Sequence, residues 1–465
     1  MNYISTRGEA PKLGFEDVLL AGLARDGGLY LPESWPQISA EMIRSFATKP
    51  FAEIAVEVIH PFVGGSIARD ELRRMADDAY ATFGQPEVTP LVELSPGNYI
   101  LELFHGPTLA FKDVAMQLLG RVMDHVLEKR GQRAMIVGAT SGDTGGAAID
   151  AFRSSSRVDV VILFPDGRVS DVQRRMMTTP TEANVHAVAI DGTFDDCQAL
   201  VKAMFNDHAF RDRVQLSGVN SINWARIVAQ ITYYFYAAAR LGAPDRSVSF
   251  SVPTGNFGDI FAGYAARRMG LGIDKLIIAS NENDILPRTV SSGAYEMRSV
   301  KATSSPSMDI QISSNFERYL FEAADRDPAK IRGFMQALST DKRFELGDLW
   351  QNLKSDFSAA AASEDDVSEC IRSTQKKFGY VLDPHTACGV VATQRLKPAG
   401  AVVTLATAHP AKFPDVIERI TGARPALPER LANLMTDPER FEVLPASLKA
   451  IQTYVDSVAS ARVKA

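Results

Sequence analysis

Short apolar runs and amphipathic helical stretches alternate through the middle of the chain. Four runs rich in valine and isoleucine predict buried strands, at 99–104, 134–139, 158–164 and 185–190. Between them, apolar residues recur at the i, i+3, i+4 spacing that predicts helices, at 112–129, 144–153, 170–178 and 194–207. Strands that alternate with helices predict a parallel sheet with helices on both faces.

The two flanking regions have different patterns. Residues 1–95 mix short strands with helical stretches at 40–62 and 68–83, and Pro86 and Pro90 mark a boundary. After residue 215 the pattern predicts further strands at 247–252, 275–280 and 401–406 and helices at 222–241 and 258–269. A mostly helical region at 315–378 follows, in which 359–366 is expected to be a surface connection. We therefore predict three domains, at 1–95, 96–215 and 216–465.

Composition narrows the classes of function. A chain of 465 residues with 46% hydrophobic and 23% charged residues is an ordinary globular protein of more than one domain. Its net charge of −6, without a block rich in lysine and arginine, argues against nucleic-acid binding. No apolar run approaches the roughly 18 residues of a membrane span, and the first residues lack a secretion signal. Three scattered cysteines favour a cytoplasmic protein without a disulfide framework or metal site.

Lys112 stands where the strand 99–104 and the turn His105-Gly106-Pro107 lead into the helix 112–129. A cation opposes the helix dipole at this place, and the neighbouring Phe111 is expected to face inward. Burial disfavours the charged form, so an inward lysine loses its proton more easily. A lysine needs this property to form a Schiff base with a carbonyl cofactor. The ordinary alternative is a solvated surface lysine.

A first glycine loop, 138-GATSGDTGGAA-148, lies between a predicted strand and a predicted helix. Backbone amides at such a helix start bind anions, and the hydroxyls of Ser141 and Thr144 can assist. Asp143 would repel a phosphate unless its carboxylate turned away or bound cations. The loop matches neither the Walker P-loop nor the dinucleotide fingerprint. The amides and hydroxyls of the loop can bind the carboxylate of a ligand. The structural alternative is a plain turn in which Asp143 or Ser141 caps the helix.

A second glycine loop, 253-PTGNFGDIFAG-263, has the same position between strand and helix. Gly255 and Gly258 permit close approach of the backbone, so that Asn256, Phe257 and Gly258 can present successive N–H groups to one phosphate. Asp259 is expected to lie in the first turn of the helix, where its negative charge is favourable to the helix dipole. This position is expected in preference to direct contact with an anion. A tight turn between strand and helix is the structural alternative.

Two further segments carry candidate polar groups. Thr407 follows the strand 401–406, where a hydroxyl can reach a ligand at the carboxyl edge of a sheet, or simply complete a turn. Lys412, a little further on, can meet an anionic substrate, but an exposed position is the default expectation. In 220-NSINWAR-226, Asn223 and Arg226 lie at a helix start, where capping explains part of the pattern and Arg226 can clamp an anion. Three histidines without metal-ligand spacing are interpreted as turn or supporting residues: His105, His385 and His409.

Together these segments resemble the threonine synthase family of pyridoxal-phosphate enzymes. HGPTLAFKD around Lys112 is similar to the family's cofactor-lysine motif, GATSGDTG to its substrate loop, PTGNFGD to its phosphate loop and TAHPAKF to its ring-nitrogen segment. YISTRG at 3–8 and GLARDGGLYLP at 22–32 resemble its N-terminal domain, so the likeness spans 3–420. Asp143, where the wider fold type usually has asparagine, argues against a serine dehydratase or cysteine synthase. The helical insert resembles the bacterial and fungal type.

The resemblance implies a fold and an activity. The fold is the tryptophan-synthase-β-like type II α/β fold, with two open α/β domains around the cofactor and a smaller N-terminal α+β domain. The activity is a carbon–oxygen lyase reaction that converts O-phospho-L-homoserine and water to L-threonine and phosphate, the last step of threonine biosynthesis. The expected partners are this small molecule and pyridoxal 5'-phosphate, with no nucleic acid, membrane or metal. A monomer is one state compatible with the sequence, which does not fix the oligomeric state.

The resemblance also implies roles for individual residues. Lys112 holds the cofactor as a Schiff base and then acts as general base, and Thr407 meets the ring nitrogen. The cofactor phosphate is assigned to Gly255, Asn256, Phe257, Gly258 and Asp259. The substrate is assigned to Ser141, Gly142, Asp143, Thr144, Asn223 and Arg226. Three alternatives stay open: another type II amino-acid lyase or dehydratase, a non-catalytic ligand-binding relative, and a nucleotide-binding α/β protein, whose spacing rules both glycine loops lack.

Overall fold

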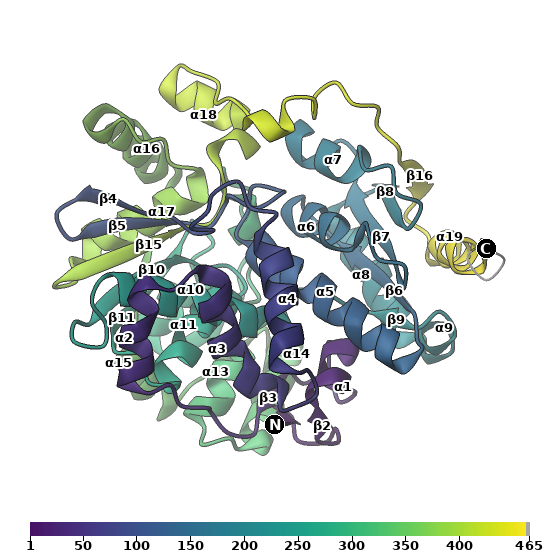
Figure 1. The fold of residues 1–465 in the computed structure, drawn as a ribbon, viewed down its shortest axis with the longest axis horizontal. Helices are drawn as coiled ribbons and strands as arrows, with labels where there is room; N and C mark the ends of the chain where they lie inside the picture. The colour runs from purple at the N-terminus through teal and green to yellow at the C-terminus, as the bar shows by residue number, and fades with distance from the viewer. Residues whose placement is uncertain (462–465) are drawn as a thin grey trace.

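The computed structural model describes residues 1–461, which form two mainly parallel sheets that lie side by side with helices around them (Figure 1). The larger sheet has the order β14-β11-β10-β15-β5-β4, and only its β4–β5 pair is antiparallel. Its strands are β4 (Leu91–Ser95), β5 (Asn98–Glu102), β10 (Val248–Pro253), β11 (Ile273–Ser280), β14 (Phe357–Ala361) and β15 (Ala401–Ala406).

The smaller sheet is parallel throughout, with the order β16-β8-β7-β6-β9. Its strands are β6 (Ala134–Ala139), β7 (Val158–Pro165), β8 (Val185–Asp191), β9 (Leu216–Ser217) and β16 (Glu442–Pro445). All residues of β7 are buried, as expected for a parallel strand covered on both faces. The helices that precede, connect or cover these strands are α5 (Lys112–Arg130), α6 (Asp143–Phe152), α7 (Asp171–Thr178), α8 (Phe194–Asn206), α9 (His208–Arg213) and α19 (Leu448–Ala461).

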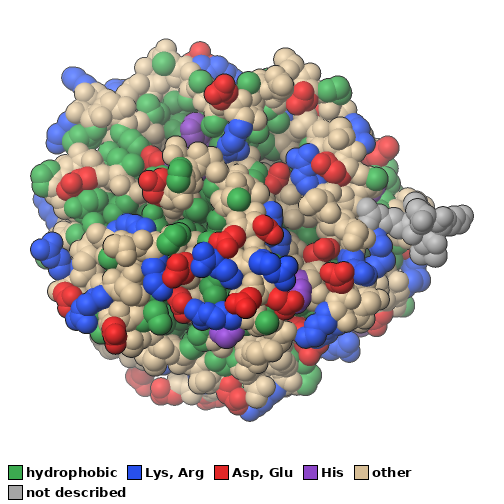
Figure 2. Space-filling model, viewed as in Figure 1, with side chains coloured by type: hydrophobic (Ala, Val, Ile, Leu, Met, Phe, Trp, Pro, Cys, Tyr) green, Lys and Arg blue, Asp and Glu red, His purple; other side chains and the backbone are tan. Residues whose placement is uncertain are grey.

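The N-terminal region is the predicted α+β unit. An antiparallel sheet of order β2-β1-β3 carries the first residues of the chain. Its elements are β1 (Asn2–Ser5), β2 (Leu13–Gly14), β3 (Tyr30–Pro32), α1 (Phe15–Ala21), α2 (Ala40–Ser45), α3 (Phe51–Val63) and α4 (Arg69–Tyr80). Figure 2 shows acidic and basic side chains interleaved over α3 and α4, where Arg73 pairs with Glu53 and Asp77.

The remaining helices pack around the larger sheet. Helix α10 (Trp224–Arg240) is buried on nearly every side, which explains its almost continuous apolar sequence. The others are α11 (Gly258–Arg268), α12 (Ile285–Ser292), α13 (Phe316–Ala323), α14 (Pro328–Asp341), α15 (Leu349–Asp356), α16 (Glu364–Phe378), α17 (Pro384–Leu396) and α18 (Pro414–Thr421). A small antiparallel sheet pairs β12 (Ala294–Glu296) with β13 (Arg343–Glu345). Within residues 1–461, no helix combines the length and apolarity needed to cross a bilayer.

The structure corrects two expectations about the elements and adds one strand for which none was stated. The run at 99–104 was predicted to share a domain with the strands at 134–139, 158–164 and 185–190. In the structure it forms β5, which pairs with β15 of the larger sheet. The segment 359–366, expected to be a surface connection, overlaps the end of β14, which pairs in parallel with β11. The tail beyond residue 420, where the family resemblance ends, adds β16 to the smaller sheet. Each sheet therefore draws strands from both sides of a predicted boundary, and the division at residues 95 and 215 stays a prediction.

The loops that carry the candidate residues converge because of this topology. Lys112 lies beyond β5, the first glycine loop follows β6, the second follows β10, and Thr407 follows β15. These strands are parallel within their sheets, so their carboxyl ends meet on common edges. Ligands of open α/β sheets bind at such edges.

Candidate active site

Lys112 is the first residue of α5, and it is buried, as its sequence context predicted. Its Nζ lies 3.2 Å from Asp143 Oδ2 and 4.7 Å from the ring centroid of Phe111. Burial lowers the pKa of Lys112, Asp143 opposes this effect, and the charges of Lys412 and Arg226 add to it. The amine is therefore easier to deprotonate than that of a surface lysine.

Asp143 is the centre of a buried polar cluster. Its Oδ1 accepts hydrogen bonds from Lys412 Nζ at 2.7 Å and Gln173 Nε2 at 2.9 Å. Its Oδ2 accepts from Lys112 Nζ and, at 3.3 Å, from Ser307 Oγ. Burial alone would raise the pKa of the carboxyl group, but the two lysines hold it well below its usual range. The carboxylate thus binds two cationic side chains, those of Lys112 and Lys412. Cation binding is one of the two arrangements that the sequence analysis allowed for an aspartate in an anion-binding loop.

Lys412 was expected to be exposed, and this expectation is wrong. Only 1% of the residue is accessible, because the 3₁₀ turn Pro410–Lys412 directs the side chain inward. Its Nζ also donates to the carbonyl oxygen of Thr108 at 2.7 Å. No local sequence pattern marks this burial, since the partner Asp143 lies in the other sheet's loops. Gln173 and Ser307 were missed for the same reason.

The first glycine loop is shaped by Thr140 and Gly142. The hydroxyl of Thr140 accepts from the N–H groups of Gly142 and Gly145, both at 2.9 Å, so Thr140 satisfies the start of α6 and neither Ser141 nor Asp143 caps it. Gly142 has φ +134°, and a Cβ there would lie 2.4 Å from Gln173 Cδ. The half-buried side chains of Ser141 and Thr144 remain at the open start of the helix. They are available to a polar ligand there.

The second glycine loop ends at the start of α11, with Phe257 in the left-handed conformation at φ +67°. The Phe257 ring is fully buried against aromatic residues that include Phe316. Asn256 Oδ1 accepts from Gly258 N at 2.9 Å. A Cβ on Gly255 would lie 2.9 Å from the carbonyl oxygen of Ser307, so this position requires glycine. The loop thus forms a close-fitting turn at a helix N-terminus, which suits a phosphate.

Asp259 lies in the first turn of α11, as predicted. Its Oδ1 accepts from the hydroxyls of Tyr233 at 2.5 Å and Tyr234 at 3.0 Å. Burial raises the pKa of the carboxyl group to about 6, although both tyrosines oppose this effect. The side chain is thus bonded to helix α10, so any contribution of Asp259 to a phosphate comes from its backbone N–H.

Thr407 lies beside the lysine turn. Its carbonyl oxygen accepts from Phe111 N at 2.9 Å, and Ala408 forms a β-bridge with Ala110. Within residues 1–461 its hydroxyl has no protein hydrogen-bond partner, and 5% of the residue is accessible. The hydroxyl is therefore available to a ligand atom.

The three histidines have supporting positions, as expected. His105 Nε2 lies 2.7 Å from Glu102 Oε2, and His385 Nδ1 lies 2.9 Å from Asp383 Oδ1. His409 Nδ1 accepts from Ala411 N at 3.1 Å at the start of the turn that carries Lys412. Burial lowers the pKa of His409 to about 4, so its ring is neutral at pH 7.

Arg226 and Asn223 differ in what they can offer a ligand. Arg226 is 2% exposed; its Nη1 donates to Val219 O at 3.3 Å, and its Nε has no partner among the described residues. Burial lowers its pKa to about 10. Asn223, by contrast, caps α10 through Ala225 N and donates to the carbonyls of Leu19 and Gly218. Its amide is occupied by the fold, so a substrate contact at Asn223 gains no support.

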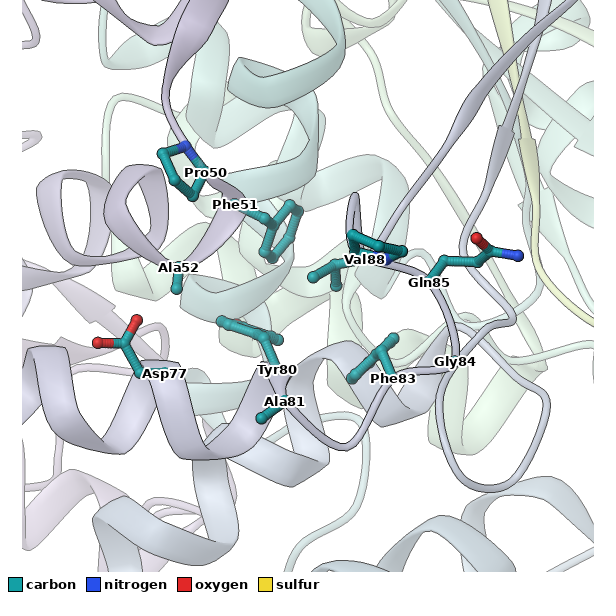
Figure 3. A pocket seen from close by; sticks show the side chains of 11 residues that line it. Pro50, Phe51, Ala52, Asp77, Tyr80, Ala81, Phe83, Gly84, Gln85 and Val88 are labelled. Atoms are coloured by element: carbon teal, nitrogen blue, oxygen red, sulfur yellow. The ribbon is translucent and has the colours of Figure 1, made fainter. Parts of the chain in front are cut away.

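A pocket of about 440 Å³ lies apart from these residues, between α3, α4 and the segment 83–88 (Figure 3). None of the candidate site residues lines it. It is lined mainly by apolar and aromatic side chains, among them Phe51, Tyr80 and Val88.

The polar groups of the site are those that pyridoxal phosphate needs for binding. The site offers a buried amine with a lowered pKa, a helix start after a glycine turn, a free neutral hydroxyl and a buried arginine with an unpartnered Nε. Such a set on the edges of two α/β sheets defines the class of pyridoxal-phosphate-dependent enzymes that attach the cofactor to lysine. A family profile described as pyridoxal-phosphate dependent enzyme matches residues 83–408.

Two further profiles and the related proteins specify the family. The profile for the threonine synthase N terminus matches residues 2–80, and the one for the threonine synthase C-terminal part matches 386–455. Threonine synthase of Pseudomonas aeruginosa is 51% identical over 98% of both chains. The chain belongs to the threonine synthase family. The C-terminal profile also covers the tail beyond residue 420, which sequence reasoning had left unassigned.

Solved structures agree with this assignment. Pyridoxal-phosphate-bound threonine synthase from Brucella melitensis is 58% identical, with a TM-score of 0.96 over 99% of both chains. Yeast threonine synthase is 39% identical, with a TM-score of 0.93 over 99% of both chains. The expected type II fold with an added N-terminal α+β unit and the expected cofactor are confirmed.

Proposed function

We propose that this chain converts O-phospho-L-homoserine and water to L-threonine and phosphate, as the last step of threonine biosynthesis. The observation that carries the proposal is the buried Lys112 amine, placed against Asp143 between the two glycine loops. The named activity of relatives that align along nearly the whole chain supports it. The bound cofactor supplies delocalisation of the electrons released when a proton leaves the substrate.

Lys112 is proposed to carry the protons of the reaction. Lys112 would hold the cofactor, and its Nζ, when free, would remove the substrate proton at Cα and serve next at Cβ. A base must be neutral to accept a proton, and burial favours the neutral form. Asp143 alone would keep Lys112 charged, but Lys412 shares the carboxylate and weakens that effect. The two ion pairs together poise Lys112 for both giving and taking a proton.

The other residues are proposed to orient the two bound molecules. The backbone of Gly255, Asn256, Phe257, Gly258 and Asp259 holds the cofactor phosphate, and the Thr407 hydroxyl meets the ring nitrogen. Thr407 is neutral, so it does not favour protonation of that nitrogen. Ser141, Gly142 and Thr144 at the start of α6 bind the amino-acid end of the substrate. Arg226 attracts an anionic group, because its buried guanidinium has no carboxylate partner among residues 1–461.

An assay with O-phospho-L-homoserine tests the proposal. Equal amounts of threonine and phosphate are expected. Release of ammonia and a keto acid from serine, threonine or homoserine, without turnover of the phosphorylated substrate, would indicate a dehydratase instead. A yellow protein inactive on all of these would indicate a ligand-binding relative. Borohydride reduction followed by peptide mass spectrometry is expected to locate the cofactor on Lys112, and recovery on a different lysine would contradict its role.

We further propose that the enzyme works as a monomer in the cytoplasm. The free thiols of Cys197, Cys370 and Cys388 are all buried and suit a reducing compartment. Light scattering coupled to size exclusion tests the monomer, and cell fractionation tests the location.

A further inference from the structure

The turn that leads to Lys112 is held through its carbonyl groups. His105 O accepts from Gly84 N at 2.9 Å, Thr108 O from Lys412 Nζ at 2.7 Å, and Leu109 O from His409 N at 3.0 Å. Gly84, on the rim of the pocket in Figure 3, approaches the turn from the N-terminal side. Within the turn, Leu109 N donates to Gly106 O at 3.1 Å, and the N–H and hydroxyl of Thr108 donate to Asp113 of α5. The outside donors satisfy the carbonyl groups that these local bonds leave over.

Arg430 supplies the largest share of these donors. Its Nη2 donates to His105 O at 3.2 Å and to Gly106 O at 2.6 Å, and its Nη1 donates to Pro107 O at 3.1 Å. Three successive carbonyls are thus bonded to one planar guanidinium. Arginine suits this task because its donors are fixed in a rigid fork, whereas lysine offers a single nitrogen.

The backbone of the turn is strained at Leu109. This residue has φ +60°, which is unusual for a side chain other than glycine. It is 1% exposed and packs with Leu434, Val172 and Met176. A strained conformation persists only where the surroundings impose it. Leu434 belongs to the same C-terminal segment as Arg430, so that segment imposes the conformation through both polar and apolar contacts.

The segment 427–440 also holds the other side of the catalytic cluster. Glu439 accepts from Arg174 Nε and Thr178 Oγ1 of α7, both at 2.8 Å. Helix α7 carries Gln173, which bonds Asp143. In Figure 1 this part of the chain runs from α18 past α7 to β16. One segment therefore contacts both the turn before Lys112 and the helix behind Asp143.

We propose that Arg430 is a positioning residue, which sets the location of the Lys112 amine by fixing the carbonyls of residues 105–107. This role rests on the proposed function of Lys112 as the cofactor lysine. Displacement of a reacting group by about 1 Å can cost roughly 100-fold in rate. The C-terminal segment thereby contributes to catalysis, although Arg430 contacts neither the Lys112 amine nor the Asp143 carboxylate.

The test compares Arg430→Ala and Arg430→Gln with Arg424→Ala in the full-length holoenzyme. Arg424 precedes this segment in the sequence and lies on the surface. Among residues 1–461 it pairs only with Asp415 and Glu418 of α18, so it is the matched control. We expect kcat of Arg430→Ala to fall about 10- to 100-fold with KM changed less than about 3-fold. Arg430→Gln, which keeps one amide donor group, should lie between Arg430→Ala and wild type. Guanidinium ion at millimolar concentration should restore part of the activity of Arg430→Ala only.

Two measurements do not depend on turnover. In the protein without cofactor, amide hydrogen exchange of residues 105–111 should be faster in Arg430→Ala than in Arg424→Ala and wild type. In the holoenzyme, the pH midpoint of the cofactor absorbance change should move in Arg430→Ala alone. Unchanged exchange together with unchanged kcat in Arg430→Ala would overturn the proposal. So would an equal loss of kcat in Arg424→Ala, which would indicate a general effect of losing a surface arginine from this part of the chain. Wild-type protein that lacks activity on phosphohomoserine while exchange still responds would refute the proposed function alone.

Discussion

Asp143 and Lys412 form an ion pair of 2.7 Å between a loop of the smaller sheet and a turn beyond the last strand of the larger sheet. Both side chains are almost fully buried. An isolated charge is very costly at such a depth, and a buried pair is tolerated only when its remaining bonds are satisfied. Here they are, since Asp143 also bonds Lys112 and Gln173, and Lys412 also bonds Thr108 O. The pair therefore joins the two sheets at the proposed catalytic amine.

Replacing Lys412 with methionine should harm both stability and catalysis. Removal of one partner from a buried pair costs about 3–5 kcal/mol, and urea unfolding measures this loss. Asp143 would then act on Lys112 alone and raise its pKa, so kcat should fall and its pH optimum should move upward. Lys449→Met, at an exposed position of α19, is the control.

A double variant separates the two effects of Lys412. In Lys412→Met with Asp143→Asn, both charges are gone and much of the stability should return, whereas activity should not. Stability losses that simply add in the double variant would show that the two residues do not interact.

Gly142→Ala should be destabilising, because φ is +134° and the new Cβ would lie 2.4 Å from Gln173 Cδ. We expect a loss of at least about 2 kcal/mol, together with weaker substrate binding as Gln173 moves from Asp143. Gly146→Ala on the same helix is the matched control, because its Cβ would lie 3.6 Å from Met176 Cβ in ordinary contact. That variant should be neutral or slightly more stable. Equal unfolding midpoints for the two variants would contradict the prediction.

His409 should make the folded protein sensitive to acid. Burial lowers its pKa to about 4, while an unfolded chain has the ordinary value of about 6.5. Below pH 6.5 the unfolded state therefore binds the extra proton first, so stability falls as the pH drops from 6.5 to 4, by roughly 3 kcal/mol at most. Protonation of Nδ1 would also break its bond from Ala411 N.

The variant His409→Asn tests whether His409 causes the predicted fall in stability at low pH. Asparagine can accept from the same N–H but does not titrate, so unfolding free energies at pH 7.5 and pH 5 should differ less than in wild type. His208→Asn, at an exposed position, should keep the wild-type difference. A fall in stability of wild-type size in His409→Asn would assign the acid sensitivity to other groups.

The elements next to the site could be predicted because their signals are local. The apolar stripe of α5, the glycine turn before α11 and the valine-rich β7 each carry their pattern within a few residues. Burial of Lys112 was predictable because it follows Phe111 and begins a helix whose apolar stripe starts at Val114. The loops then meet because parallel strands bring their carboxyl ends together.

The long-range polar contacts could not be predicted in this way. Lys412 and Ser307 reach Asp143 from distant segments, and nothing adjacent to either residue in the sequence marks the contact. Strand β14 was missed because an alanine run lacks the β-branched residues that usually indicate a strand. Asn223 lies in a motif that suggested a ligand contact; its amide caps α10 and bonds two carbonyl groups, and a contact with substrate stays a prediction.

Arg226→Met should raise stability and lower activity. The buried guanidinium of Arg226 has no carboxylate partner within residues 1–461, and its Nε makes no hydrogen bond there. Replacing it with an apolar side chain removes an uncompensated charge, so the protein without ligands should gain about 1–4 kcal/mol in unfolding free energy. The loss of a charged hydrogen bond to an anionic substrate group should lower kcat/KM about 10- to 100-fold.

Arg318→Met is the matched control, because Arg318 is equally buried but donates to Tyr30 O at 3.0 Å and to Ile222 O at 2.6 Å. Its removal leaves those carbonyls unsatisfied, so this variant should lose stability. Opposite signs for the two arginines, measured by thermal unfolding of the protein without ligands, would show that Arg226 is retained for binding and not for the fold. Inorganic phosphate should inhibit wild type more strongly than Arg226→Met. A loss of stability in Arg226→Met as large as in Arg318→Met would mean that the fold itself satisfies this guanidinium, and the anion-binding role would fail.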